Sequence, residues 1–95
     1  MAIKVMIKRT VPQYTEAELL VLIKEMRILT TQQPGYISGE TLKRLDKSGQ
    51  SLVISMWQSL EDWERWLQSE ERSRIQNKID ALVGKTTEFQ IFDYE

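Results

Sequence analysis

The sequence predicts an α+β protein of the ferredoxin-like class, with the order β-α-β-β-α-β and two helices on one face of an antiparallel sheet. Strand-like segments lie at residues 2–9, 36–45, 51–57 and 88–94. Helical segments, with apolar residues three or four positions apart, begin near Thr15 and Ser59. Neither a repeat nor a low-complexity linker interrupts these elements, which indicates a single domain over residues 1–95.

The first part of the chain predicts a strand followed by a helix. Ile3, Val5 and Ile7 occupy every second position and form a strongly apolar strand face. Residues 15–18 have the Ser/Thr-x-x-Glu form of a capping box, in which hydroxyl and carboxylate each accept from a free backbone N–H. A helix is therefore expected to begin at Thr15 with this cap.

The middle of the chain predicts a hairpin. Pro34-Gly35 favours a turn, because proline fixes one dihedral angle and glycine allows the left-handed one. A strand from about Tyr36 to Leu45 follows, and the polar residues 46–50 connect it to a strand at residues 51–57. We expect these two strands to be antiparallel neighbours.

The last part predicts a broken helix and a strand. Ser59-Leu60-Glu61-Asp62 repeats the capping pattern and indicates a helix start. The polar segment at Ser69 predicts a break, and the continuation ends at Gly84, since glycine readily adopts the left-handed conformation that closes a helix. A final strand is expected from Glu88 to Tyr94.

The apolar residues of the last two strands exceed what two helices can cover. Leu52, Ile54 and Met56 alternate with Val53 and Trp57, so residues 51–57 are apolar on both faces. Residues 88–94 are apolar on both faces as well. We therefore expect a homodimer, in which a second copy covers the open face of the sheet and completes a dimeric α+β barrel.

Composition excludes several classes of partner. Thirteen Lys and Arg oppose fourteen Asp and Glu, giving a net charge of −1, so no nucleic acid partner and no anionic membrane surface is expected. No apolar run approaches the roughly 20 residues of a membrane span, and the N-terminus lacks a secretory pattern. A cytoplasmic location follows as an expectation.

The chain has no histidine and no cysteine, so no metal site is expected.

Several motifs together resemble the antibiotic biosynthesis monooxygenase (ABM) family along almost the whole chain. They are Gln33-Pro34-Gly35-Tyr36, Gly39-Glu40, Ser55-Met56-Trp57 and the segment from Ser59 to Ser69. In that family a PGF or PGY turn precedes strand two, and a Trp closes strand three before a helix with an aromatic-x-x-Trp-Leu-x-Ser pattern. The resemblance implies the dimeric α+β barrel fold and places the chain near monooxygenases, which are oxidoreductases.

The resemblance also bears on cofactors. In the haem-degrading branch of the superfamily, a helix Trp is followed ten residues later by the proximal His, and an Asn lies on strand one. Trp66 falls at the Trp position, Gln76 at the His position, and Lys8 approximately at the Asn position. Because glutamine is a poor iron ligand and no histidine is present, haem is not expected. We expect no cofactor.

We predict a small-molecule site between the sheet and the helices, bordered by Trp66. Its further candidate residues are Lys8, Tyr36, Arg72 and Gln76. The break at Ser69 would open a gap beside the indole, and such a gap suits a planar ligand. The alternative for Trp66, as for Trp63, is packing in the core, and the alternative for Arg72 is a solvated helix charge.

Two classes of function remain open at this point. The first is a cofactor-independent monooxygenase acting on a planar aromatic or quinol-like molecule, whose carbanion itself reduces oxygen while protein dipoles stabilise the anion. The second is a non-catalytic dimeric module that binds a small aromatic molecule in the same cavity. The sequence assigns no catalytic residue.

Overall fold

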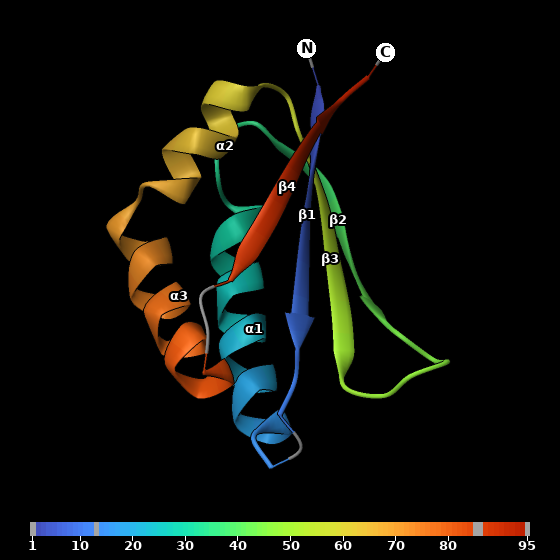
Figure 1. Ribbon diagram of the computed structural model, residues 1–95. Helices are drawn as coiled ribbons and strands as arrows, with labels where there is room; N and C mark the ends of the chain where they lie inside the picture. Colours follow the sequence, from blue (N-terminus) through green and yellow to red (C-terminus); the bar gives the residue numbers. More distant parts are fainter. Residues whose placement is uncertain (1, 13, 85–86, 95) are drawn as a thin grey trace.

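A computed structural model describes residues 2–12, 14–84 and 87–94. The elements in chain order are β1 (Ile3–Thr10), α1 (Glu16–Thr31), β2 (Tyr36–Lys43), β3 (Gln50–Trp57), α2 (Leu60–Leu67), α3 (Glu70–Val83) and β4 (Glu88–Asp93). The strands form one antiparallel sheet in the order β2-β3-β1-β4, and the helices lie together on one side of it (Figure 1). The predicted ferredoxin-like α+β fold is confirmed.

β1 lies in the interior of the sheet, hydrogen-bonded to β3 on one side and to β4 on the other. Its side chains alternate as predicted, so that Ile3, Val5 and Ile7 are buried against the helices. The same alternation continues to Arg9, which is only 6% exposed. The helix-facing side of β1 is therefore a row of three apolar side chains that ends in a guanidinium.

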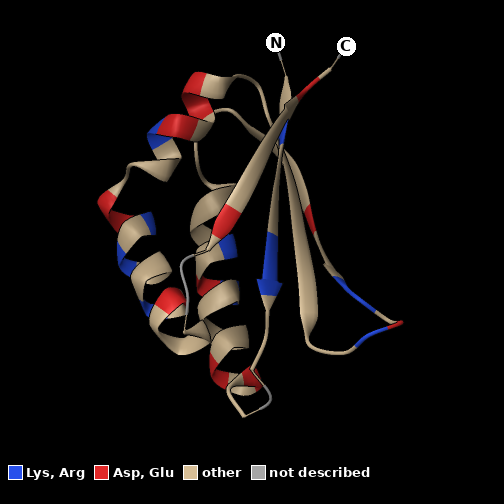
Figure 2. Ribbon diagram, viewed as in Figure 1, with Lys and Arg blue, Asp and Glu red and all other residues tan. Residues whose placement is uncertain are grey.

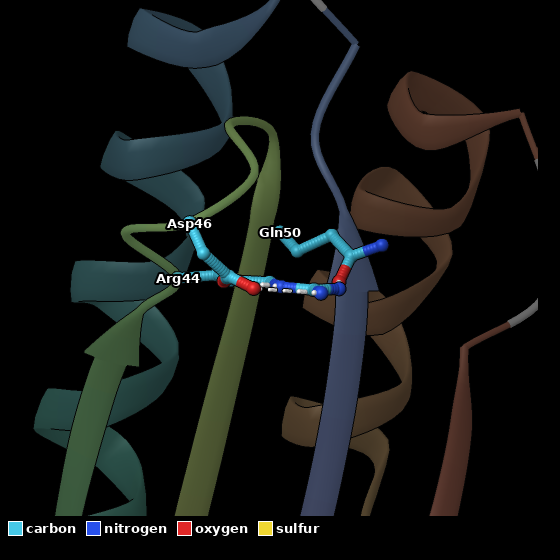
Figure 3. Close-up of polar contacts among 3 residues, drawn as sticks. All are labelled: Arg44, Asp46 and Gln50. Carbon is cyan, nitrogen blue, oxygen red and sulfur yellow. Dashed lines mark hydrogen bonds and ion pairs between the residues drawn. The ribbon is translucent and has the colours of Figure 1, made fainter.

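The β2–β3 hairpin is confirmed, although β2 ends at Lys43 and not at Leu45. The backbone N–H of Arg44 still donates to the Gln50 carbonyl at 3.0 Å. Its guanidinium donates to both Asp46 carboxylate oxygens, at 2.7 and 3.1 Å, and to Gln50 Oε1 at 2.7 Å (Figure 3). These hydrogen bonds join the two ends of the β2–β3 connection through its polar side chains. Regular pairing therefore ends two residues earlier than expected, at Lys43, and the Arg44 side chain bonds residues of the connection.

Of the two predicted caps, the one at Ser59 is confirmed and the one at Thr15 is wrong. Ser59 Oγ accepts from the backbone N–H of Asp62 at 3.2 Å. Ser69, predicted only as a break, also caps a helix, because its Oγ accepts from the backbone N–H of Arg72 at 3.2 Å. α1 starts where expected, but Thr15 makes no side-chain cap bond, and its hydroxyl donates to the Pro12 carbonyl. With φ −115° and ψ 7°, Thr15 lacks the extended backbone that aims a capping hydroxyl at the helix.

The predicted break at Ser69 is also confirmed. α2 ends at Leu67 and α3 begins at Glu70, and Ser69 bonds the Trp66 carbonyl through both its backbone N–H and its hydroxyl. Since an α-helix turns about 100° per residue, positions 66 and 72 of one unbroken helix would point roughly 120° apart. The break therefore frees Trp66 and Arg72 to face the same space.

The core has two buried clusters on the helix side of the sheet. The first joins the β1 row with Trp57, Trp63 and Trp66. The second joins Leu19 of α1 with Ile75 and Ile79 of α3. Met26 and Leu29 of α1 pack against both clusters, so α1 is the element that connects the sheet core to the α3 core.

The Pro34-Gly35 turn holds the start of α2 against the start of β2. Gly35 adopts φ +85°, which an L side chain rarely tolerates, and its carbonyl accepts from the Gln58 N–H at 2.7 Å. A Cβ at Gly35 would overlap the Asp62 side chain. That side chain is fixed, because it accepts from Ser59 Oγ and from Arg65.

The other face of the sheet carries no helix. On it lie Met6, the predicted apolar residues Leu52, Ile54 and Met56 of β3, and Phe92 of β4. Leu42 and Phe92 are well exposed there. β3 carries no charged residue, and β4 carries acidic residues only at its two ends (Figure 2). In the described part of the chain, no helix is long and apolar enough to cross a membrane.

Replacing Gly35 by alanine is predicted to destabilise the fold by about 2 kcal/mol or more, because left-handed backbone costs roughly 1–2 kcal/mol and the methyl group displaces Asp62. Gly84→Ala is the matched control: Gly84 has φ +83°, and no described atom would lie within 4 Å of its Cβ. Chemical denaturation measures both variants. Equal losses would show that the overlap with Asp62 carries no penalty.

We propose that a second copy of the chain covers the open face, as the sequence predicted. Sedimentation velocity at micromolar concentration should then give a homodimer, and Ile54→Glu, at the middle of that face, should give a monomer. Leu20→Glu on the exposed side of α1 is the control and should leave the dimer intact. A stable monomer for the natural chain would contradict the proposal.

Candidate functional site

A partly open cavity of about 80 Å³ lies between α1 and the sheet, at the junction of α2 and α3. Its inner wall is formed by buried residues, namely Ile7, Arg9, Trp63, Trp66 and Arg72, and Tyr36 and Ser55 also line it. The space therefore lies where the apolar row of β1 meets its terminal guanidinium.

Aromatic rings form much of this wall. Trp66 is 2% exposed and belongs to the sheet core while also lining the cavity. Tyr36 packs edge-on against Trp57 at 5.6 Å between centroids, and Trp57 against Trp63 at 5.7 Å. Trp57 donates from Nε1 to Ser55 Oγ at 3.0 Å. Trp66 therefore combines the core role and the cavity role that the sequence left as alternatives.

Arg9 is a cavity residue that the sequence analysis did not single out. Its Nη2 donates to Gln76 Oε1 at 3.5 Å, whereas its Nε is buried without a partner among the described residues. Burial lowers the pKa of Arg9, and Asp80 partly offsets this effect. The signal was present in the sequence, because Arg9 is the next position in the series Ile3, Val5, Ile7.

Arg72 lines the cavity from the start of α3 and is 5% exposed, so it is not a solvated helix charge. Its guanidinium lies over the Trp63 ring, 5.2 Å from the centroid. Burial lowers the pKa of Arg72 to about 10, with a further lowering by the charge of Arg9 and an opposing effect of Asp80. At neutral pH the Arg72 guanidinium therefore remains charged, as arginine side chains do in proteins generally.

Gln76 lies behind the cavity wall, in a network that fixes its amide. Its Nε2 donates to Asp80 Oδ1 at 2.8 Å and to Thr87 Oγ1 at 2.6 Å. Asp80 Oδ1 also accepts from the backbone N–H of Thr87 at 3.0 Å and from its hydroxyl at 2.6 Å. This network leaves Gln76 Oε1 directed to Arg9, so Gln76 holds a cavity residue and is not itself on the lining.

The structure brings together three of the five predicted site residues and separates the others. Tyr36, Trp66 and Arg72 line the same cavity, and Gln76 contacts it through Arg9. Lys8 does not belong to this group, because it is exposed on the open face of the sheet, paired with Leu52. The period of two along β1 decides this, since only the odd-numbered positions face the helices.

The mouth of the cavity lies between α1 and β2. Arg27, Glu40 and Thr41 line it and are exposed. Arg27 Nη2 donates to Thr41 Oγ1 at 2.6 Å and thereby connects the two sides. Among the described residues, no group of three His, Cys, Asp or Glu side chains lies close enough to hold a metal ion.

Comparison with protein families matches the antibiotic biosynthesis monooxygenases over residues 2–78. No curated protein shows significant similarity to the chain.

Solved structures share the fold across the whole chain. A conserved protein from Methanosarcina mazei Go1 superimposes with a TM-score of 0.92 at 20% identity, covering 100% of this chain and 94% of the other. SnoaB, a cofactor-independent oxygenase from Streptomyces nogalater, gives 0.86 at 20% identity, covering 99% and 93%. A Mycobacterium tuberculosis protein gives 0.89 at 13% identity, covering 100% and 96%. At these identities the likeness establishes the fold.

Trp66→Ala is predicted to lower the free energy of unfolding by about 3–5 kcal/mol, because it removes a buried indole from the sheet core. Glu64→Ala, at an exposed position of the same helix, should change it by no more than about 0.5 kcal/mol. Chemical denaturation followed by circular dichroism measures both. A Trp66→Ala variant as stable as the natural chain would mean that the indole adds nothing to the core.

Proposed function

The chain belongs to the antibiotic biosynthesis monooxygenase family, and from this membership we propose that it is a cofactor-independent monooxygenase acting on a small planar aromatic or quinol-like molecule. The observation that carries the proposal is the cavity that combines aromatic walls with two buried guanidiniums. Trp66 and Tyr36 offer apolar area to a ring, and Arg9 and Arg72 offer positive charge to an anion formed from it.

The chemistry that this arrangement supports starts from an acidic C–H group. Loss of the proton to solvent at the mouth leaves a carbanion or enolate, which the buried guanidiniums stabilise because water screens them little. The anion transfers one electron to O₂, and the resulting radical pair forms a C–O bond. The protonated peroxide then loses water, so that a methylene group and O₂ become a carbonyl group and H₂O.

The alternative is a non-catalytic module that binds a small molecule in the same cavity. The observation in its favour is size, because about 80 Å³ is below the roughly 300–1,000 Å³ of typical ligand sites. Much of a larger substrate would stay outside the cavity, where the protein does not exclude water from the reaction. A ligand of more than one ring would extend through the mouth between α1 and β2. A cytoplasmic location remains an expectation from the sequence under either function.

Oxygen uptake by the purified protein with anthrone, or with a related compound that has an acidic methylene group, tests the proposal. One O₂ should be consumed per substrate oxidised, and Arg72→Gln should lower the turnover number by about 100-fold or more, because it removes charge from the developing anion. Arg74→Gln, at an exposed position of the same helix, is the matched control and should leave the rate unchanged. Binding of these substrates without oxygen uptake would favour the non-catalytic module.

A further inference from the structure

We propose that Arg9 and Arg72 form an anion site at the inner end of the cavity, and that its ligand is a compact carboxylate bearing an apolar planar group. The inference deepens the proposed function, on which it rests for the use of this cavity as the ligand site. It concerns binding and not turnover, and it specifies a group that the ligand carries before any reaction.

The first observation is that two residues lining the cavity have buried hydrogen-bond donors without acceptors among the described residues. Arg9 Nε and Trp63 Nε1 are both fully buried, and neither has a partner among the described residues. Arg9 as a whole is more than nine-tenths buried, and both residues line the cavity. A buried donor without an acceptor is costly, so the lining suits a ligand that accepts hydrogen bonds.

The second observation is the charge balance. The ion pairs in the described ranges join Arg44 to Asp46 and Arg65 to Asp62, so no described carboxylate lies within salt-bridge distance of Arg9 or Arg72. Asp80 acts on both from further away. Its Oδ1 already accepts from Gln76 and Thr87.

The third observation is that the two guanidiniums are charged and close enough to affect each other. The positive charge of Arg9 lowers the pKa of Arg72, yet the resulting value of about 10 leaves Arg72 protonated at neutral pH, and arginine side chains in general stay protonated in proteins. Two like charges in a space shielded from water destabilise each other. One anion placed between them would reduce this repulsion and would also accept hydrogen bonds from donors that lack a partner.

Shape and chemistry select a carboxylate among anions. A guanidinium matches the two oxygens of a carboxylate with parallel N–H donors. The rest of the wall is mostly apolar and aromatic, including Ile7 and Trp66, although Ser55 also lines it. It therefore offers little to the additional oxygens and charge of a phosphate. At the mouth, Arg27 of α1 is exposed and donates to Thr41, whereas Glu40 is paired with Ile54, so its side chain belongs to the open face of the sheet.

The volume limits the ligand to a compact one. About 80 Å³ is roughly half of the 150 Å³ of an engineered closed cavity that accepts benzene. A carboxylate group fits at the inner end, and an attached single ring would lie along Trp66 and reach the mouth beside Thr41. Benzoate is therefore a suitable probe, and benzamide is its neutral counterpart of nearly the same shape.

Isothermal titration of the full chain with benzoate and with benzamide at pH 7 and low salt tests the proposal. Benzoate should bind at least about tenfold more tightly than benzamide, because only the anion forms charge-assisted hydrogen bonds. Arg9→Gln and Arg72→Gln should each lower the benzoate affinity by about tenfold or more, and Arg9→Lys should restore part of it. Arg74→Gln should change neither affinity.

Thermal denaturation with and without benzoate shows whether each variant folds. If Arg9→Gln does not fold, the test rests on the benzoate affinity of Arg72→Gln. Equal affinities for benzoate and benzamide, or benzoate affinity unchanged in both glutamine variants, would overturn the proposal. Tighter binding of inorganic phosphate than of benzoate would overturn the carboxylate assignment. Benzoate binding without oxygen uptake on any substrate would refute the proposed function alone, whereas oxygen uptake without preference for the anion would refute only this inference.

Discussion

The position of β1 inside the sheet is the constraint on which the rest of the structure depends. With β3 on one side and β4 on the other, its backbone is fully committed to the two ladders, and its side chains can only alternate between the two faces. Three apolar residues anchor the helices, and Arg9, at the end of the same row, is carried into the interior with them. The cavity lies where this row changes from apolar to charged.

The interruption between α2 and α3 has a comparable effect on the other wall. Ser69 ends one helix by bonding the Trp66 carbonyl and starts the next by accepting from the Arg72 N–H. An indole of one helix and a guanidinium of the next therefore line the same space. A small polar residue thus determines how the larger cavity residues are arranged, although Ser69 is not on the cavity lining itself.

Burying two guanidiniums without a neighbouring carboxylate opposes folding, because burial disfavours the charged form of each. The surrounding core supplies the compensation. Three indoles, the β1 row and the α1–α3 contact bury apolar surface on both sides of the charged pair. Gln76, fixed by Asp80 and Thr87, keeps one guanidinium directed into the cavity. A chain of 95 residues can therefore retain a charged interior site.

The sequence by itself determined the element order, the hairpin, the break at Ser69 and the inward face of β1, because each depends on local periodicity or on a capping residue next to the element it limits. It also indicated Tyr36, Trp66 and Arg72, which the structure brings to one cavity. It misplaced Lys8 and overlooked Arg9, although period two along β1 distinguishes them. Only the tertiary structure decided that Arg9 and Arg72 line one cavity and that Gln76 lies behind Arg9. These residues are distant in sequence and come together only when α3 packs against α1 on the helix side of the sheet.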